Sequence, residues 1–119
     1  MLFVCYPKCT TCQKAKKFLD ACGAVYTTRD IKLENPTREE LALWHERSGL
    51  DLKKFFNTSG MQYRALSLKD RLPDMCEEEM LDLLASDGML VKRPLLIAGD
   101  RVLVGFREAQ WALLLSADQ

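Results

Sequence analysis

The sequence is short of the residues that metal sites require. Among its 119 residues there is one histidine, His45, and a single pair of cysteines, Cys9 and Cys12, has the spacing Cys-x-x-Cys. A structural zinc site takes four nitrogen or sulfur ligands, typically from two such pairs or from one pair and two histidines. The sequence therefore predicts no metal site, and we expect no other cofactor.

An excess of charge of one sign and long apolar runs are also missing. Lysine plus arginine and aspartate plus glutamate are equal at 17 each, so the formal net charge is zero. This balance argues against direct binding of nucleic acid. No apolar run approaches the roughly 20 residues of a membrane span, and the start, MLFVCYPKC, lacks the basic segment and long apolar core of a signal peptide. We therefore expect a cytoplasmic protein without a membrane partner.

What is present suits one hydrophobic core. The length is that of one domain, and 48% of the residues are hydrophobic, which is enough for a single core. We therefore predict one domain over residues 1–119.

The hydrophobic period changes twice in the first 31 residues. Residues 2–6 are an apolar run of strand formers that ends at Pro7. From Thr10 onward, apolar residues recur at steps of three and four and predict a helix that Gly23 closes. Residues 24–31 then predict a second strand, which gives a βαβ unit. The apolar stripe of the helix comprises Cys12, Ala15, Phe18, Leu19 and Cys22.

Residues from about 35 to 88 predict a helical insertion without a strand. Thr37 and Glu40 have the spacing of a capping box ahead of a helix that Gly49 closes. Asp74 and Glu77 repeat this spacing ahead of a helix that ends near residue 88. Residues 50–57 predict a short helix, and NTSG at 57–60 predicts a turn.

The last part of the sequence returns to strands. Residues 95–98 and 101–104 are β-rich apolar runs, and Gly99-Asp100 between them is a two-residue hairpin signal. Residues 107–116 predict a terminal helix. The whole order is βαβ, helical insertion, ββα, which predicts an α/β fold with a mixed four-stranded sheet.

The pair Cys9 and Cys12 carries most of the chemical information. In a reducing compartment such a pair is more often catalytic or metal-binding than structural. Cys9 is predicted at a helix N-terminus, where backbone N–H groups, the helix dipole and the adjacent Lys8 stabilise a thiolate. Cys12 lies one turn inside the helix and faces the core. We therefore predict that Cys9 attacks a substrate and that Cys12 resolves the mixed disulfide.

The remaining cysteines and the histidine are predicted to be structural. Cys5, Cys22 and Cys76 stand in apolar surroundings, and free cysteine is among the most buried residue types. We expect all three to be small core residues. His45 is expected to be a surface or half-buried helix residue and not a general base.

The order of elements, with Cys-x-x-Cys after the first strand, matches the thioredoxin-like fold. More closely, the sequence resembles the ArsC/Spx family of arsenate-reductase-like and Spx-like proteins over essentially its whole length. The resemblance is carried by YPKCTTCQKAKKFL at the first helix, NTSG in the middle, and VKRPLLI and VGF near the end. It implies a cis peptide bond before Pro94, opposite Cys9, and an Arg93 guanidinium that faces an oxyanion or the thiolate.

From these arguments we assign two groups of site residues. The catalytic group comprises Cys9, Cys12 and Arg93, and the binding group comprises Lys8, Thr10, Thr11 and Pro94.

The resemblance implies three alternative functions. We favour a thiol–disulfide oxidoreductase that is reduced by glutathione, glutaredoxin or thioredoxin. The second alternative is an Spx-like redox-sensing transcription regulator that binds the C-terminal domain of the RNA polymerase α subunit. Gly49 falls near a glycine of that contact, although it also fits an ordinary helix C-cap.

The third alternative is a true arsenate reductase. The enterobacterial reductases of this family use one cysteine and three arginines around the arsenate. Here only Arg93 has a clear place, because Thr58-Ser59 and Gly105-Phe106 stand where the other two arginines would fall. Arg64 and Arg107 are nearby in sequence and are the candidates to replace them. A single arginine would hold the oxyanion weakly, so we do not favour this function.

Overall fold

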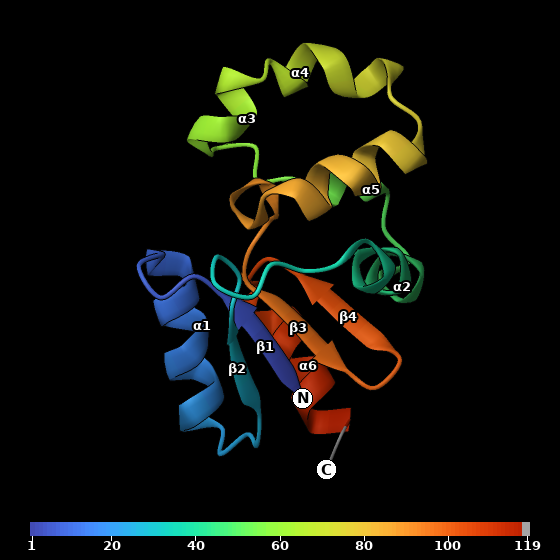
Figure 1. The fold of residues 1–119 in the computed structure, drawn as a ribbon. Coiled ribbons are helices and arrows are strands. Elements are labelled where there is room, and N and C mark those ends of the chain that lie inside the picture. The colour runs from blue at the N-terminus through green and yellow to red at the C-terminus, as the bar shows by residue number, and fades with distance from the viewer. Residues whose placement is uncertain (118–119) are drawn as a thin grey trace.

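The computed structural model describes residues 1–117, and a four-stranded sheet forms its centre (Figure 1). The strands are β1 (Leu2–Cys5), β2 (Thr27–Asp30), β3 (Leu95–Ala98) and β4 (Arg101–Val104). Their order in the sheet is β2-β1-β3-β4, with β1 parallel to β2 and both other pairs antiparallel. The predicted α/β fold with a mixed four-stranded sheet is confirmed.

Each face of the sheet is covered by helices. On one face, Phe3 of β1 packs with Cys12 of α1 (Thr10–Ala21) and Trp111 of α6 (Glu108–Ala117). Because side chains alternate along a strand, Val4 points to the opposite face. There it joins the core that includes Leu41 of α2 (Arg38–Ser48). The sheet therefore lies between two helical layers.

The segment between β2 and β3 is helical, as predicted. It consists of α2, η1 (Leu52–Phe55), α3 (Met61–Ala65), α4 (Leu68–Arg71), η2 (Leu72–Asp74), α5 (Glu77–Ser86) and η3 (Gly88–Leu90). An isolated β-bridge joins Phe56 to Val91 and so brings the middle of the segment back to its end. Figure 1 shows α3, α4 and α5 beyond one end of the sheet, far from the N-terminus. None of the helices within residues 1–117 is both long and apolar enough to cross a membrane.

The predicted capping signals are confirmed at α2 and wrong at α5. The Thr37 hydroxyl accepts the Glu40 N–H at 3.1 Å, the Glu40 carboxylate accepts the Thr37 N–H at 3.0 Å, and Gly49 ends the helix at φ +70°. These residues form the predicted capping box and C-cap.

At α5 the cap lies two residues later than predicted. Cys76 is the N-cap, and the Glu79 carboxylate accepts both its N–H at 3.4 Å and its thiol at 3.3 Å. Asp74 does not cap the helix, because a 3₁₀ turn that contains Pro73 ends at Asp74 and leaves the next residue extended. Glu77 is therefore the first residue of α5 and not the third.

The burial predicted for the isolated cysteines is confirmed at Cys5 and wrong at Cys22 and Cys76. Cys5 is buried on β1, whereas the other two are exposed. Cys22 is the C-cap of α1, and the chain turns away at Gly23 with φ +68°, so the apolar stripe ends before it. Cys76 is exposed because it caps a helix at its solvent-facing end.

The strand ends also differ from the prediction. β1 ends at Cys5 and β2 covers only Thr27–Asp30, because these four residues are the ones that pair with β1. Residues 24–26 form a loop instead. The Gly99-Asp100 hairpin is confirmed, with Gly99 at φ +60°.

Candidate functional site

The loop from β1 to α1 places Cys9 at the start of a helix. Its N–H donates to the Tyr6 carbonyl at 2.9 Å, and its own carbonyl accepts the Gln13 N–H at 3.0 Å. With φ −81° and ψ 124°, Cys9 is the N-cap of α1. Its side chain is half-buried, whereas Cys12 is 2% exposed. The two thiols thus have different access to solvent, as predicted.

The pKa of the Cys9 thiol is lowered by the start of α1. Partial burial is the largest single influence and opposes ionisation, but several groups together outweigh it. These are the N–H and thiol of Cys12, the N–H of Thr11 and the positive charge of Arg93. The cysteine makes no side-chain capping bond, so the N–H groups favour the thiolate through their position at the positive end of the helix.

The pKa of Cys12 moves in the opposite direction. Burial raises it to about 12, against the lowering effect of the Tyr6 N–H, which donates to the Cys12 sulfur at 3.4 Å. The negative charge of the nearby Cys9 raises it further. Cys12 is therefore held as a neutral thiol beside a neighbour that ionises easily.

Arg93 lies across from this pair, and the bond between it and Pro94 is cis, as expected from the resemblance. Its guanidinium carbon is 5.4 Å from the centre of the Tyr6 ring, and one terminal nitrogen donates to the Met89 carbonyl at 3.4 Å. Its Nε is buried and has no hydrogen-bond partner among the described residues. Arg93 thus keeps donor capacity for an anionic ligand or for the thiolate. Pro94 is buried, and its carbonyl accepts the Gly105 N–H at 2.8 Å.

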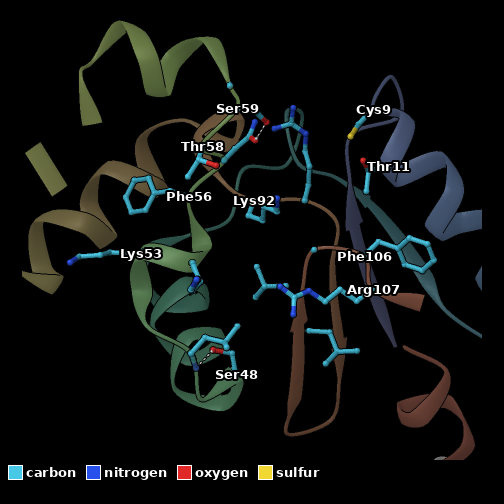
Figure 2. A pocket seen from close by; sticks show the side chains of 18 of the residues that line it. Cys9, Thr11, Ser48, Lys53, Phe56, Thr58, Ser59, Lys92, Phe106 and Arg107 are labelled. Atoms are coloured by element: carbon cyan, nitrogen blue, oxygen red, sulfur yellow. Dashed lines mark hydrogen bonds between the residues drawn. The ribbon is translucent and has the colours of Figure 1, made fainter. Parts of the chain in front are cut away.

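A large groove adjoins these residues, with a volume of about 1110 Å³ (Figure 2). Cys9 and Thr11 line one end. The NTSG turn borders it too, and this turn is fixed by the Asn57 N–H, which donates to the Leu90 carbonyl at 2.8 Å. Residues 102–107, which extend from β4 to the residue before α6, also line the groove.

The groove brings together only some of the predicted residues. Arg107 lines it with Cys9 and Arg93, whereas Arg64 does not. The predicted binding residues Lys8 and Thr10 are exposed and lie outside the lining, while Thr11 lies in it.

Sequence reasoning missed the lysines of the groove. Lys92, Lys53 and Lys54 all line it. The motif VKRP places Lys92 next to Arg93, which was the available signal. Nothing in the sequence placed Lys53 and Lys54 near the cysteine pair.

The described part of the chain contains no group of three or more histidine, cysteine, aspartate or glutamate side chains that could hold a metal ion. Cys22 and Cys76 are exposed at the ends of different helices, and His45 is half-buried with its ring against Phe55.

Comparison with known proteins gives one family. The model of the ArsC family matches residues 5–114. The chain is 56% identical to the uncharacterised protein YusI of Bacillus subtilis over 93% of this chain and 94% of that protein. It is 28% identical to the regulatory protein MgsR of the same species, over 92% of this chain and 86% of that one.

Solved structures agree with this result. An ArsC-family-related protein from Bacteroides fragilis superposes with a TM-score of 0.93 at 54% identity, over 95% of each chain. A protein of Streptococcus mutans described as a possible arsenate reductase has a TM-score of 0.86 at 50% identity, over 94% of this chain and 95% of that one.

Proposed function

The chain belongs to the ArsC family, and on this premise we propose that it is a thiol–disulfide oxidoreductase with Cys9 as nucleophile and Cys12 as resolving thiol. The observation that carries the proposal is the opposite shift of two neighbouring thiols. The pKa of the accessible Cys9 is lowered, and the pKa of the buried Cys12 is raised to about 12. One thiol is thereby prepared to attack while the other stays protonated.

The reaction proceeds by two thiol–disulfide exchanges. The Cys9 thiolate attacks one sulfur of the substrate disulfide, forms a mixed disulfide and releases the other half of the substrate as a thiolate. Cys12 then loses its proton, attacks the Cys9 sulfur and releases the second half. The substrate gains two electrons, and the protein is left with a Cys9–Cys12 disulfide.

The geometry supplies a reason for the order of these steps. The charge of Cys9 is one of the groups that raise the pKa of Cys12. Once Cys9 is in a mixed disulfide this charge is gone, so the pKa of Cys12 falls. The first leaving thiolate can then accept its proton. Attack by Cys9 thus activates Cys12.

A second thiol compound completes the cycle by reducing the Cys9–Cys12 disulfide. We propose glutathione, glutaredoxin or thioredoxin for this step, in the cytoplasm, where such reductants keep thiols reduced. Arg93 serves the same site, because its charge lowers the pKa of Cys9.

Peptide mapping after mild oxidation tests the proposal. Because Cys22 and Cys76 are exposed, the starting protein is the Cys22→Ser, Cys76→Ser variant. Limiting peroxide followed by blocking of free thiols is expected to give a reversible Cys9–Cys12 disulfide. Adding Cys12→Ser is expected to leave Cys9 as sulfenic acid or as a mixed disulfide. A dominant bond from Cys9 to the buried Cys5, or no disulfide at all, contradicts the role given to Cys12.

A second candidate function is a redox-switched transcription regulator that uses the same disulfide as its sensor. The similarity to the regulatory protein MgsR supports it. The partner would be the C-terminal domain of the RNA polymerase α subunit. A pull-down with that domain, in reduced and oxidised protein, tests the idea: capture that depends on the oxidation state supports regulation, and the absence of capture in both states rejects it.

A further inference from the structure

We propose that the groove beside Cys9 binds an extended, acidic polypeptide segment that carries the substrate disulfide and pairs with the outer edge of β4 at Val104. This inference rests on the disulfide exchange proposed for Cys9 and specifies its substrate as a protein or peptide disulfide. It is supported by the backbone of β4, by the size of the groove and by the charge of its lining.

The backbone of β4 leaves polar groups free at the edge of the sheet. In antiparallel pairs, hydrogen-bonded and non-hydrogen-bonded residue pairs alternate. The Gly105 N–H donates to the Pro94 carbonyl, so this pair is hydrogen-bonded. By the register of β3 and β4, the pairs of Val104 with Leu95 and Val102 with Ile97 are then the non-hydrogen-bonded ones. The N–H and carbonyl groups of Val102 and Val104 therefore point away from β3.

Val102 and Val104 both line the groove, but only Val104 is half-buried; Val102 is 4% exposed and packs in the core with Leu41 of α2. β4 is the last strand in the order β2-β1-β3-β4, so no strand covers this edge. Within residues 1–117, no backbone or side-chain hydrogen bond outside the sheet reaches Val102 or Val104. Consecutive residues 102–105 all line the groove, although their side chains alternate between the two faces of the sheet. A strand edge presents consecutive residues in this way, and an extended peptide pairs with such an edge.

The size of the groove favours a peptide over a small oxyanion. Its volume of about 1110 Å³ exceeds the ~300–1,000 Å³ of most small-molecule pockets. It extends from Cys9 to Ser48 and Leu50, at and after the end of α2. Figure 2 shows Cys9 and Ser48 at opposite sides of the hollow, with Lys92 and Arg107 between them. A chain of several residues fills such a space, whereas a single tetrahedral ion occupies a small part of it.

The charge of the lining selects acidic chains. In the part of the chain that the structure describes, the lining contains five basic residues and no aspartate or glutamate. None of these basic side chains forms an ion pair with a described carboxylate. The whole chain is neutral, so this positive surface is a local feature that a negatively charged peptide complements. The five residues are Lys53, Lys54, Lys92, Arg93 and Arg107.

The topology brings such a peptide to the nucleophile. β1 and β4 each run antiparallel to β3, so they are parallel to each other and their carboxyl ends lie at the same end of the sheet, with β3 between them. Cys9 follows the end of β1, and Arg107 follows the end of β4. A peptide paired with Val104 on the outer side of β4 therefore reaches Cys9 by passing Arg107 and turning across the ends of β4 and β3, which lie between this edge and β1. Its disulfide meets the Cys9 thiolate there, and the exchange follows the two steps described above.

Three matched peptides and one small disulfide test this proposal. Each peptide has a central cysteine in a disulfide with 2-nitro-5-thiobenzoate, whose release in a single turnover of the reduced Cys22→Ser, Cys76→Ser protein is followed by absorbance; the second-order rate constant of this release is taken as kcat/KM. The first peptide has glutamates around the cysteine, and the second has lysines. The third is the glutamate peptide with N-methyl groups on alternate residues, which cannot complete a strand ladder. Hydroxyethyl disulfide, which is neutral and too small to reach β4, reports the reactivity of the cysteine pair alone.

We expect kcat/KM for the glutamate peptide to exceed that for the lysine peptide by about tenfold, as two or three exposed ion pairs would give. The preference is expected to fall as salt is raised. N-methylation is expected to lower kcat/KM severalfold. Arg107→Gln, with each rate normalised to the variant's own rate on hydroxyethyl disulfide, is expected to reduce the preference. Lys17→Gln, on the exposed side of α1, is the matched control and is expected to keep it.

The outcomes separate this inference from the proposed function. If the protein fails to reduce hydroxyethyl disulfide, the proposed disulfide chemistry is itself overturned. If the protein reduces hydroxyethyl disulfide but has equal kcat/KM for the glutamate and lysine peptides, only the proposed selection of acidic peptides by the groove is overturned. A preference for glutamate that is indifferent to N-methylation overturns the pairing with β4.

Discussion

At the scale of single residues, Arg93 and the start of α1 act on the same sulfur. The N–H groups of Cys12 and Thr11 and the charge of Arg93 all favour the Cys9 thiolate. Lys8 was expected from its adjacency in sequence to act beside Arg93, but its side chain is exposed and outside the groove. The reactivity of Cys9 thus depends on a residue that is distant in sequence and is brought near by the strand β3.

Arg93→Gln is therefore expected to raise the pKa of Cys9. The substitution removes a positive charge that stabilises the thiolate, so the plateau of alkylation shifts to higher pH. The measurement is the rate of iodoacetamide alkylation against pH in the reduced Cys22→Ser, Cys76→Ser background. Lys8→Gln is the comparison and is expected to shift the profile less. A larger shift for Lys8→Gln, or a wild-type pKa at or above the ordinary ~8.5, contradicts this account.

The raised pKa of Cys12 predicts a loss of stability at alkaline pH. In the unfolded chain this thiol ionises near pH ~8.5, whereas in the folded protein it stays neutral up to about 12. Its stabilising contribution is fully present below the unfolded pKa and is lost as the pH rises toward the folded one.

The measurement is urea unfolding of reduced wild type and Cys12→Ala at several alkaline pH values. The stability difference between them is expected to shrink by about 1.4 kcal/mol for each pH unit above ~8.5. Because other groups ionise in both proteins, their contribution to the pH dependence of stability cancels in this difference. A difference that stays constant from pH 8 to pH 11 would show that Cys12 ionises as easily in the fold as in the unfolded chain.

At the scale of elements, the capping box of α2 and the β3–β4 hairpin were predictable, whereas the cap of α5 and the end of α1 relative to the sheet were not. The box of Thr37 with Glu40 and the hairpin at Gly99 depend on neighbouring residues, so the sequence contains the whole signal. The exposure of Cys22 depends on where α1 ends relative to the sheet, which the apolar stripe alone does not reveal.

The residues of the candidate site also divide into those that the sequence could predict and those that only the fold brings together. Cys9 and Cys12 followed from spacing and predicted helix position, and Arg93 from the resemblance. Arg107 lines the same groove because the antiparallel pairing of β3 with β4 places the end of β4 beside the start of β3, just after Arg93. That register is a tertiary property, so the sequence offered Arg107 and Arg64 as equal candidates.

The turn η3 is an element whose position depends on one glycine. A Cβ at Gly88 would overlap the carbonyl oxygen of Ile31 and lie 2.5 Å from the side-chain oxygen of Asn35. Gly88→Ala is expected to cost about 1–3 kcal/mol in the free energy of unfolding, as overpacking does. Urea unfolding measures this, with Ser116→Ala on the exposed side of α6 as a control.

This substitution also has a functional readout. Met89, the next residue, provides the carbonyl that accepts a hydrogen bond from Arg93. Displacement of η3 is therefore expected to move Arg93 and to raise the pKa of Cys9 in the alkylation assay. Asn35→Ala is not expected to rescue Gly88→Ala, because the Ile31 carbonyl belongs to the backbone. Unchanged stability of Gly88→Ala would contradict the close packing of η3 against the residues after β2.

At the scale of the whole molecule, positive charge is gathered on one surface of a neutral chain. The described basic residues outside the groove include Arg29, whose side chain forms a bidentate pair with Glu40, and Lys16, which pairs with Asp20. The basic residues of the groove are left without such carboxylates. The groove thus gathers five cations with no aspartate or glutamate among its lining residues.

This surface does not reproduce the arrangement needed for arsenate. A tetrahedral oxyanion is held by several charge-assisted, often bidentate, hydrogen bonds. Arg93 acts on Cys9, but Thr58 and Ser59 face the groove where a second arginine would be needed. Figure 2 shows Arg107 directed into the groove on the side of Ser48, away from Cys9. An arsenate ion at Cys9 would therefore have one guanidinium partner.

We accordingly expect no saturable arsenate reduction in the presence of glutathione and glutaredoxin, measured as coupled NADPH oxidation. Hydroxyethyl disulfide in the same mixture is the positive control, because its reduction requires only the cysteine pair. Saturable arsenate turnover that is lost in Cys9→Ser would contradict the prediction. In that case Arg107→Gln identifies the missing donor: loss of turnover would show that Arg107 moves to Cys9 when arsenate binds, and retention would leave Arg93 as the sole guanidinium of a weak site.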